Sequence, residues 1–92
     1  MTRADVINMI AQSIQDVNAE RESGSQITLS EDLPLTGAGT PLDSLDFVNF
    51  TTGLEERLRQ ASGEEFDLAE ALFDQSEPFR TVGKLADFLA KE

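Results

Sequence analysis

The stretch TPLDSLDFVNF, residues 40–50, holds the side chain best suited to covalent chemistry, a serine beside two aspartates. Thr40 and Pro41 mark a turn, and the apolar residues after them recur at helical spacing. Asp43 or Ser44 would cap the first backbone amides, so Ser44 is expected at a helix N-terminus. A serine at that position is either an exposed hydroxyl that can be modified or no more than a helix cap.

The chain lacks the side chains that would make Ser44 a catalytic nucleophile. It has no histidine, cysteine, tyrosine or tryptophan, which excludes the commonest general base, thiolate chemistry and the usual nitrogen and sulfur ligands of metals. Its lysines, Lys84 and Lys91, fall near the C-terminus, and nothing in the pattern puts either beside the serine. No calcium loop or glycine-rich phosphate loop occurs. We therefore expect a protein that is not an enzyme and holds no metal.

Charge restricts the partners. Eighteen acidic and seven basic residues give a formal net charge of −11, beyond the magnitude of about 2–8 that is usual for a small domain. Such a surface repels phosphate backbones and anionic lipid, so we expect neither nucleic acid nor a membrane as a partner. It favours basic protein partners, although excess acid also suits solubility alone.

Ninety-two residues make one small domain, residues 1–92, with room for a modest core. No apolar run approaches the roughly eighteen residues needed to span a bilayer. The beginning, MTRADVINMI, does not resemble a secretory signal. We expect a soluble, cytoplasmic monomer that is held together by helix packing, because it has no cysteine for disulfides.

The elements that position Ser44 are predicted to be helices. The first covers about residues 3–21, opened by a capping box of Thr2 and Asp5. A long connector follows, and we expect several of its apolar residues to be buried. The stripe of the first helix is Val6, Ile10, Ile14 and Val17, and the connector contains Ile27, Leu29, Leu33, Leu35 and Leu42.

The second helix is predicted from Ser44 to Gln60 or Ala61, with Gly63 as a left-handed cap. Its expected core face consists of Phe47, Phe50, Leu54 and Leu58. The other face combines Leu45 and Val48, apparently exposed, with Thr52, Glu55 and Glu56.

A short third helix is expected within residues 68–80, where Ser76 would act as a cap before Pro78. A last helix, about residues 82–91, would be capped by Thr81 and bury Val82, Leu85, Phe88 and Leu89. The predicted fold class is all-α, a small four-helix bundle of three main helices and one short helix, with a long loop between the first and second helices.

These features together resemble the acyl carrier protein family. The resemblance covers about Val6 to Leu89 and is strongest over residues 31–58, EDLPLTGAGTPLDSLDFVNFTTGLEERL. The tripeptide D-S-L alone is weak, but it stands here with the helix order, the chain length and the acidic balance of free-standing carriers.

The resemblance implies that Ser44 carries a covalent 4′-phosphopantetheine group, which a phosphopantetheinyl transferase takes from coenzyme A. The thiol of this arm would hold an acyl chain as a thioester for acyl-loading and acyl-processing enzymes, such as a ligase, synthase or transferase. Because the transferase supplies its own base, the carrier needs no histidine. A helix N-terminus also favours the charge of a phosphodiester.

The resemblance further implies a recognition face on the second helix, where contacts are weak and electrostatic. Its expected members are Asp43, Leu45, Asp46, Val48, Asn49, Thr52, Glu55 and Glu56. Asn49 replaces a common acid, Arg57 and Arg59 interrupt the acidic run, and the loop TGAGTP is longer than in the housekeeping fatty-acid carrier. These departures favour a specialised free-standing carrier in fatty-acid, polyketide or other secondary-metabolite biosynthesis.

Two other functions are kept as alternatives. One is a free-standing peptidyl carrier that receives an aminoacyl group, and the strong acidity favours the acyl carrier over it. The other is a helical adaptor that binds a partner without a prosthetic group.

Overall fold

The computed structural model describes residues 2–22, 24, 26–37 and 39–90. Its elements are α1 (Arg3–Ala19), α2 (Ser44–Ser62), α3 (Leu68–Asp74), the 3-10 turn η2 (Glu77–Phe79) and α4 (Val82–Ala90). The described residues form no β-strand, which confirms the predicted all-α class. As expected, α1, α2 and α4 are the main helices and α3 is the short one.

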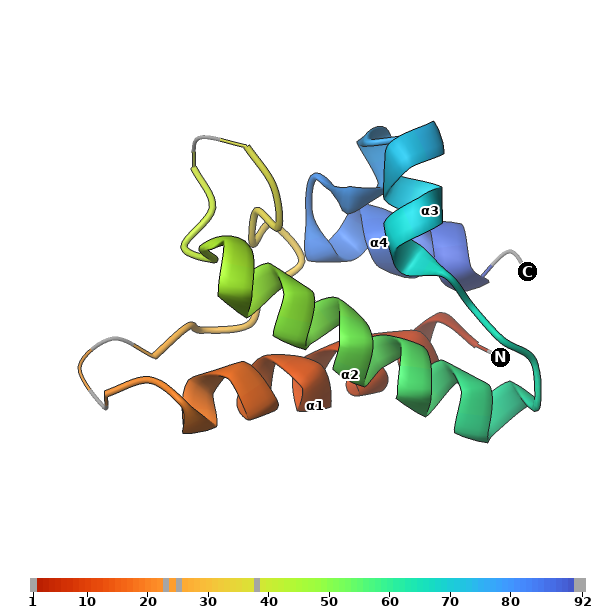
Figure 1. The fold of residues 1–92 in the computed structure, drawn as a ribbon, viewed down its shortest axis with the longest axis horizontal. Helices are drawn as coiled ribbons and strands as arrows, with labels where there is room; N and C mark the ends of the chain where they lie inside the picture. Colours follow the sequence, from red (N-terminus) through yellow and green to blue (C-terminus); the bar gives the residue numbers. More distant parts are fainter. Residues whose placement is uncertain (1, 23, 25, 38, 91–92) are drawn as a thin grey trace.

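Helix α1 is central to the packing, because it contacts both α2 and α4. Figure 1 shows α1 and α2 along one side of the molecule, with α3 and α4 on the other. The predicted capping box opens α1, since Thr2 Oγ1 accepts from the Asp5 amide at 3.1 Å and Asp5 Oδ2 accepts from the Thr2 amide at 3.2 Å. The predicted apolar stripe of α1 is buried throughout: Val6, Ile10, Ile14 and Val17.

Helix α2 begins at Ser44 as predicted and ends at Ser62, slightly beyond the predicted Gln60 or Ala61. Gly63 is its C-cap as expected, and its φ of 76° lies in the left-handed region that favours glycine. Phe50, Leu54 and Leu58 are fully buried. Phe47 differs from expectation because it is only half-buried: it lies at the edge of the core, with its ring centroid 6.5 Å from that of Phe50.

The sequence predicted one short helix within residues 68–80. The structure has a short helix there, α3, and a separate turn, η2. Asp67 caps α3 by accepting from the Glu70 amide at 2.9 Å. The extended backbone of Gln75 ends α3, and Pro78 belongs to the separate turn η2. Ser76 makes no capping hydrogen bond with its side chain, so its predicted capping role is wrong.

Helix α4 has the predicted cap, since Thr81 Oγ1 accepts from the Lys84 amide at 3.2 Å. Its buried residues include Val82, Leu85 and Leu89. Phe88 was expected in the same stripe but is half-buried, with its ring centroid 6.5 Å from that of the buried Phe79. Phe79, which the pattern did not assign, thus completes this part of the core.

The long loop between α1 and α2 is held against the helices at both ends. Asn18 accepts from the Ile27 amide at 2.7 Å and donates to its carbonyl at 3.0 Å. Farther along, the Leu35 amide donates to the Arg80 carbonyl and the Val82 amide to the Leu33 carbonyl, at 3.0 and 3.1 Å. Ile27, Leu33, Leu35 and Leu42 are buried as expected, and Leu29 is half-buried. The loop therefore delivers the chain to the start of α2 along a defined path (Figure 1).

Ion pairs engage every arginine and lysine of the described residues: Arg3, Arg21, Arg57, Arg59, Arg80 and Lys84. Arg3 joins Glu31 in the loop at 2.5 Å and Asp87 in α4 at 2.6 Å. The Arg3 guanidinium lowers the pKa of the Glu31 carboxyl below its ordinary value. The chain has 18 acidic and 7 basic residues, so its net charge of −11 has no counter-ion within the chain.

Added salt is expected to stabilise the protein. Screening weakens the repulsion among the carboxylates more than it weakens the fewer ion pairs, because the chain carries a net charge of −11. Between dilute buffer and a few hundred millimolar sodium chloride, we expect a gain of roughly 1 kcal/mol, which corresponds to about 4–8 °C in melting temperature. Thermal unfolding followed by circular dichroism measures it. An unchanged or falling melting temperature would contradict this prediction.

Candidate functional site

Ser44 is the first residue of α2, directly after the N-cap Asp43, and its side chain is exposed. Asp43 rather than Ser44 provides the cap, by accepting from the Asp46 amide at 2.7 Å. No hydrogen bond joins the Ser44 hydroxyl to another of the described residues. The hydroxyl is therefore presented to solvent at the positive end of a 19-residue helix and has no structural duty of its own.

Asp46 occupies a different environment from the one expected for a contact residue. It is only 9% exposed. Its Oδ2 accepts from Arg21 Nη1 at 2.5 Å and from the Asp43 amide at 3.4 Å. The assignment of Asp46 to an exposed recognition face is thus corrected. Its carboxylate ties Arg21, in the segment just after α1, to the first turn of α2, and it completes the capping box with Asp43.

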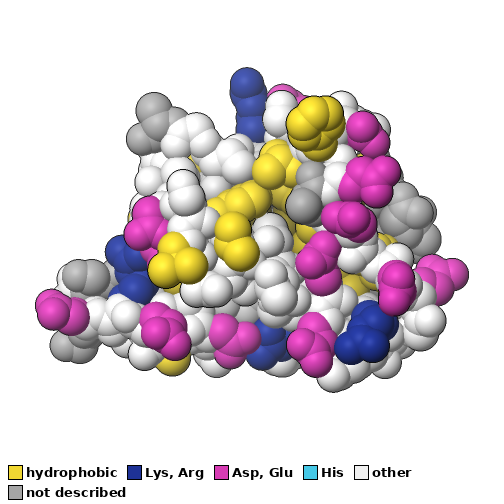
Figure 2. Space-filling view, viewed as in Figure 1, with side chains coloured by type: hydrophobic (Ala, Val, Ile, Leu, Met, Phe, Trp, Pro, Cys, Tyr) yellow, Lys and Arg dark blue, Asp and Glu magenta, His cyan; other side chains and the backbone are white. Residues whose placement is uncertain are grey.

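Four other predicted contact residues do lie on an exposed face of α2. Leu45 is 68% exposed and Val48 is 56% exposed, and Asn49 and Thr52 are also exposed. Figure 2 shows hydrophobic side chains gathered over the first half of α2 and toward α3, with acidic side chains along the border. We call Leu45, Val48, Asn49, Thr52 and Glu56 the α2 face.

Glu55 and Glu56 were expected as equivalent members of this face, but the structure separates them. Glu56 is exposed, with Arg59 Nη2 at 3.9 Å from its Oε1. Glu55 is half-buried, and its Oε2 accepts from the Leu68 amide at 2.6 Å. Glu55 therefore holds the start of α3 against α2, a tertiary role that its place in the sequence did not reveal.

The two arginines of α2 also have different roles. Arg59 remains on the surface of α2 near Glu56. Arg57 instead reaches α1, where its Nη1 donates to Asp16 at 2.7 Å and to Ser13 at 3.2 Å. Arg57 thus connects two helices, and it cannot be counted as an interruption of a surface acidic run.

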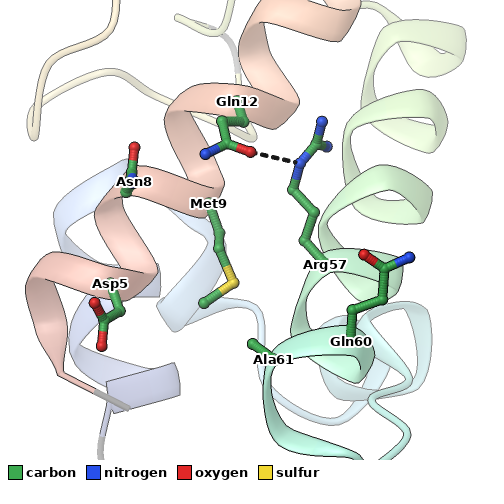
Figure 3. Close-up of a pocket in the computed structure, with 7 residues that line it drawn as sticks. All are labelled: Asp5, Asn8, Met9, Gln12, Arg57, Gln60 and Ala61. Carbon is green, nitrogen blue, oxygen red and sulfur yellow. Dashed lines mark hydrogen bonds between the residues drawn. The ribbon is translucent and has the colours of Figure 1, made fainter.

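An open groove of about 620 Å³ lies between α1 and α2. In Figure 3, Met9 extends from α1 toward Ala61, and Arg57 donates to Gln12 across the groove at 3.2 Å. Arg57 is the lining residue of α2 that comes nearest to Ser44 in the chain, 13 residues beyond it, so at 1.5 Å per residue the groove begins about 20 Å along the helix from the serine. This groove is therefore separate from the candidate site.

Metal centres and membrane-spanning helices are two other kinds of functional feature that the structure can be searched for. Within the described ranges, no group of three or more histidine, cysteine, aspartate or glutamate side chains is arranged so that it could hold a metal ion. No helix in the same part of the chain combines the length and the apolar character needed to cross a bilayer. Lys84, one of the two lysines, pairs with Glu77, and Lys91 lies outside the described residues.

Comparison of the chain with protein-family models, curated proteins and solved structures found no match in any of the three.

Proposed function

We propose that the protein is an acyl carrier that holds acyl intermediates as thioesters on a 4′-phosphopantetheine arm attached to Ser44. The observation that carries the proposal is the combination of the D-S-L motif with an exposed Ser44 hydroxyl at the first position of α2. In this proposal the protein is not itself an enzyme, and it acts in the cytoplasm as a monomer.

The surroundings of Ser44 fit a phosphate ester. The backbone amides of the first turn of α2 and the helix dipole favour a negative group there. Arg21 compensates the carboxylate of Asp46, which would otherwise oppose that charge. Asp43 uses one carboxylate oxygen for the Asp46 amide, so the N-terminus stays ordered without help from Ser44.

Ser44 Oγ would form the new bond to the pantetheine-side phosphorus of coenzyme A. The P–O bond of the pyrophosphate linkage would break, adenosine 3′,5′-bisphosphate would leave, and the hydroxyl proton of Ser44 would pass to a base on the transferase. Once attached, the arm supplies a terminal thiol for the thioester. The remaining task of this chain is presentation, since it keeps Ser44 exposed on a rigid helix. In this proposal the transferase supplies the base, because the chain has no histidine and none of the described side chains makes a hydrogen bond with the Ser44 hydroxyl.

The α2 face is the proposed docking surface for the phosphopantetheinyl transferase and for acyl-loading and acyl-processing enzymes. Leu45 and Val48 provide exposed apolar area. Asp43 and Glu56 provide exposed negative charge for a basic partner surface. Such contacts suit a carrier that has to be released after each visit, since surface charges accelerate encounter without making the complex permanent.

The test of the proposal is covalent loading of the wild-type protein. Incubation with coenzyme A, magnesium and a broad-specificity phosphopantetheinyl transferase should add the mass of one phosphopantetheinyl group. A helical adaptor would stay unmodified, and that result would overturn the proposal. Subsequent incubation of the loaded protein with acyl-activating and aminoacyl-activating enzymes separates an acyl carrier from a peptidyl carrier.

Glu56 and Glu55 should respond differently to substitution. Glu56→Lys is expected to reduce kcat/KM for loading about threefold to tenfold in dilute buffer, with a smaller effect at higher salt, because it reverses an exposed charge on the α2 face. Its melting temperature should stay near that of the wild type. Glu55→Lys should instead lose about 1 kcal/mol of stability, since the Leu68 amide loses its acceptor.

Glu55→Gln is the matched control, because it removes the charge and keeps an oxygen that can accept from the Leu68 amide. Intact-mass measurements on samples quenched at successive times give the loading rates, and thermal unfolding gives the stabilities. If Glu56→Lys is loaded at the wild-type rate at every salt concentration, the α2 face does not guide the transferase.

A further inference from the structure

Phe73 is the most exposed large hydrophobic residue of the described chain, at 93%. It lies in α3, beside the exposed acids Glu70 and Asp74. Leaving a phenylalanine in water forgoes about 1.5–3 kcal/mol that burial would provide. Together with Leu45 and Val48, it completes the set of large hydrophobic residues that are exposed in the described ranges.

The exposure of Phe73 follows from how α3 is fixed. Leu68 is buried, and its amide is bound by Glu55 of α2 at 2.6 Å. Leu72, four residues after Leu68 and on the same side of the helix, is half-buried against the core. Phe73 is rotated by about 100° from Leu72 and so points away from the core. Figure 2 shows hydrophobic side chains extending from the first half of α2 toward α3 on one face of the molecule.

The charge around the exposed side chains of Phe73, Leu45 and Val48 indicates which kind of partner can bind them. Every described arginine and lysine already has a carboxylate partner, and the chain as a whole carries −11. A second copy of this chain would bring the same charge, so repulsion opposes a homodimer across this face. A partner with an apolar pocket in a basic surface matches both the exposed aromatic ring and its acidic border.

We propose that Phe73 is an anchor residue for the phosphopantetheinyl transferase, and that it inserts into an apolar pocket with a basic rim. This inference rests on the proposed carrier function and extends the docking surface from the α2 face to α3. The α2 face and Glu70 and Asp74 guide the encounter, while Phe73 slows dissociation. Aromatic side chains commonly act in this way at protein interfaces, because one ring buries a large apolar area at a small entropic cost.

The test is the loading kinetics of Phe73→Ala with a broad-specificity phosphopantetheinyl transferase and coenzyme A. We expect KM for the carrier to rise about tenfold, with kcat within twofold of the wild type. Phe73→Leu should recover most of the affinity, because it restores apolar volume. Gln15→Ala, an exposed position on α1, is the control and should match the wild type. The melting temperature of Phe73→Ala should be unchanged, since the ring is exposed.

The salt dependence of KM distinguishes the apolar contact made by Phe73 from the electrostatic attraction provided by the α2 face. The slope of log KM against log salt should be the same for Phe73→Ala and the wild type, whereas Glu56→Lys should flatten it. A KM for Phe73→Ala within twofold of the wild type would overturn the inference and leave the carrier function standing. A dimer in sedimentation that Phe73→Ala dissociates would also overturn it and assign the face to a second copy. Failure of the wild type to load would overturn both proposals.

Discussion

Ser44→Ala is expected to abolish phosphopantetheinyl loading completely while leaving the protein folded. The alanine removes the only atom at that position that can form the phosphate ester. It should change the free energy of unfolding by no more than about 0.5 kcal/mol, because the Ser44 side chain is exposed and the cap belongs to Asp43. Intact mass after transferase treatment and urea unfolding measure the two quantities.

Two further variants serve as controls for the loading and the stability of Ser44→Ala. Ser76→Ala alters another exposed serine beside a helical turn, one that also makes no capping hydrogen bond, and it should load like the wild type. Asp43→Ala should lose about 1 kcal/mol of stability through the missing cap. Modification that persists in Ser44→Ala would move the attachment site elsewhere and remove the basis of the proposed function.

Leu54→Ala is expected to cost about 3–5 kcal/mol of folding free energy, the largest effect on stability among these variants. Leu54 is completely buried in the middle of α2, and truncation would leave a cavity beside Phe50 and Leu58 in the same cluster. Native stabilities of small domains are about 5–15 kcal/mol. The variant should therefore unfold at much lower urea concentrations, and circular dichroism at 222 nm follows the transition.

Val48→Ala is the matched comparison, because it also shortens an aliphatic side chain of α2. Val48 is 56% exposed, so its truncation should cost about 0.5 kcal/mol or less. Loading should reveal the opposite ranking, with a higher KM for Val48→Ala. If Val48→Ala unfolds the domain as Leu54→Ala does, the division of α2 into a core side and a docking side is wrong.

Local rules in the sequence were sufficient to predict α1, α2 and α4. The capping box of Thr2 and Asp5, the glycine at position 63 and the Thr81 cap all stand where they were predicted. Caps and apolar periodicity act within one or two turns of chain, so a single sequence contains them. The exposure of Ser44, Leu45 and Val48 followed from the same periodicity, which also separates them from the core residues of α2.

The tertiary structure alone decided which charged side chains are available to a partner. Asp46 pairs with Arg21, 25 residues away, and Arg57 pairs with Asp16, 41 residues away. Glu55 is held by the amide of Leu68. On a helical wheel each of these residues counts as surface, because periodicity records only the face of the residue's own helix and not what packs beside it.

The exposure of Phe73 was not predicted for the same reason, because periodicity does not record how one helix packs on another. Its apolar character and its distance from Leu68 and Leu72 gave no sign that it would be 93% exposed. The boundaries of α3 depend on the Asp67 cap and on the extended backbone of Gln75, and its orientation depends on Glu55 of α2. Composition and spacing determined the helical class and the presented serine. The docking of short α3 on the larger helices determined which apolar side chain remains in water, because a helix of two turns has no stable orientation of its own.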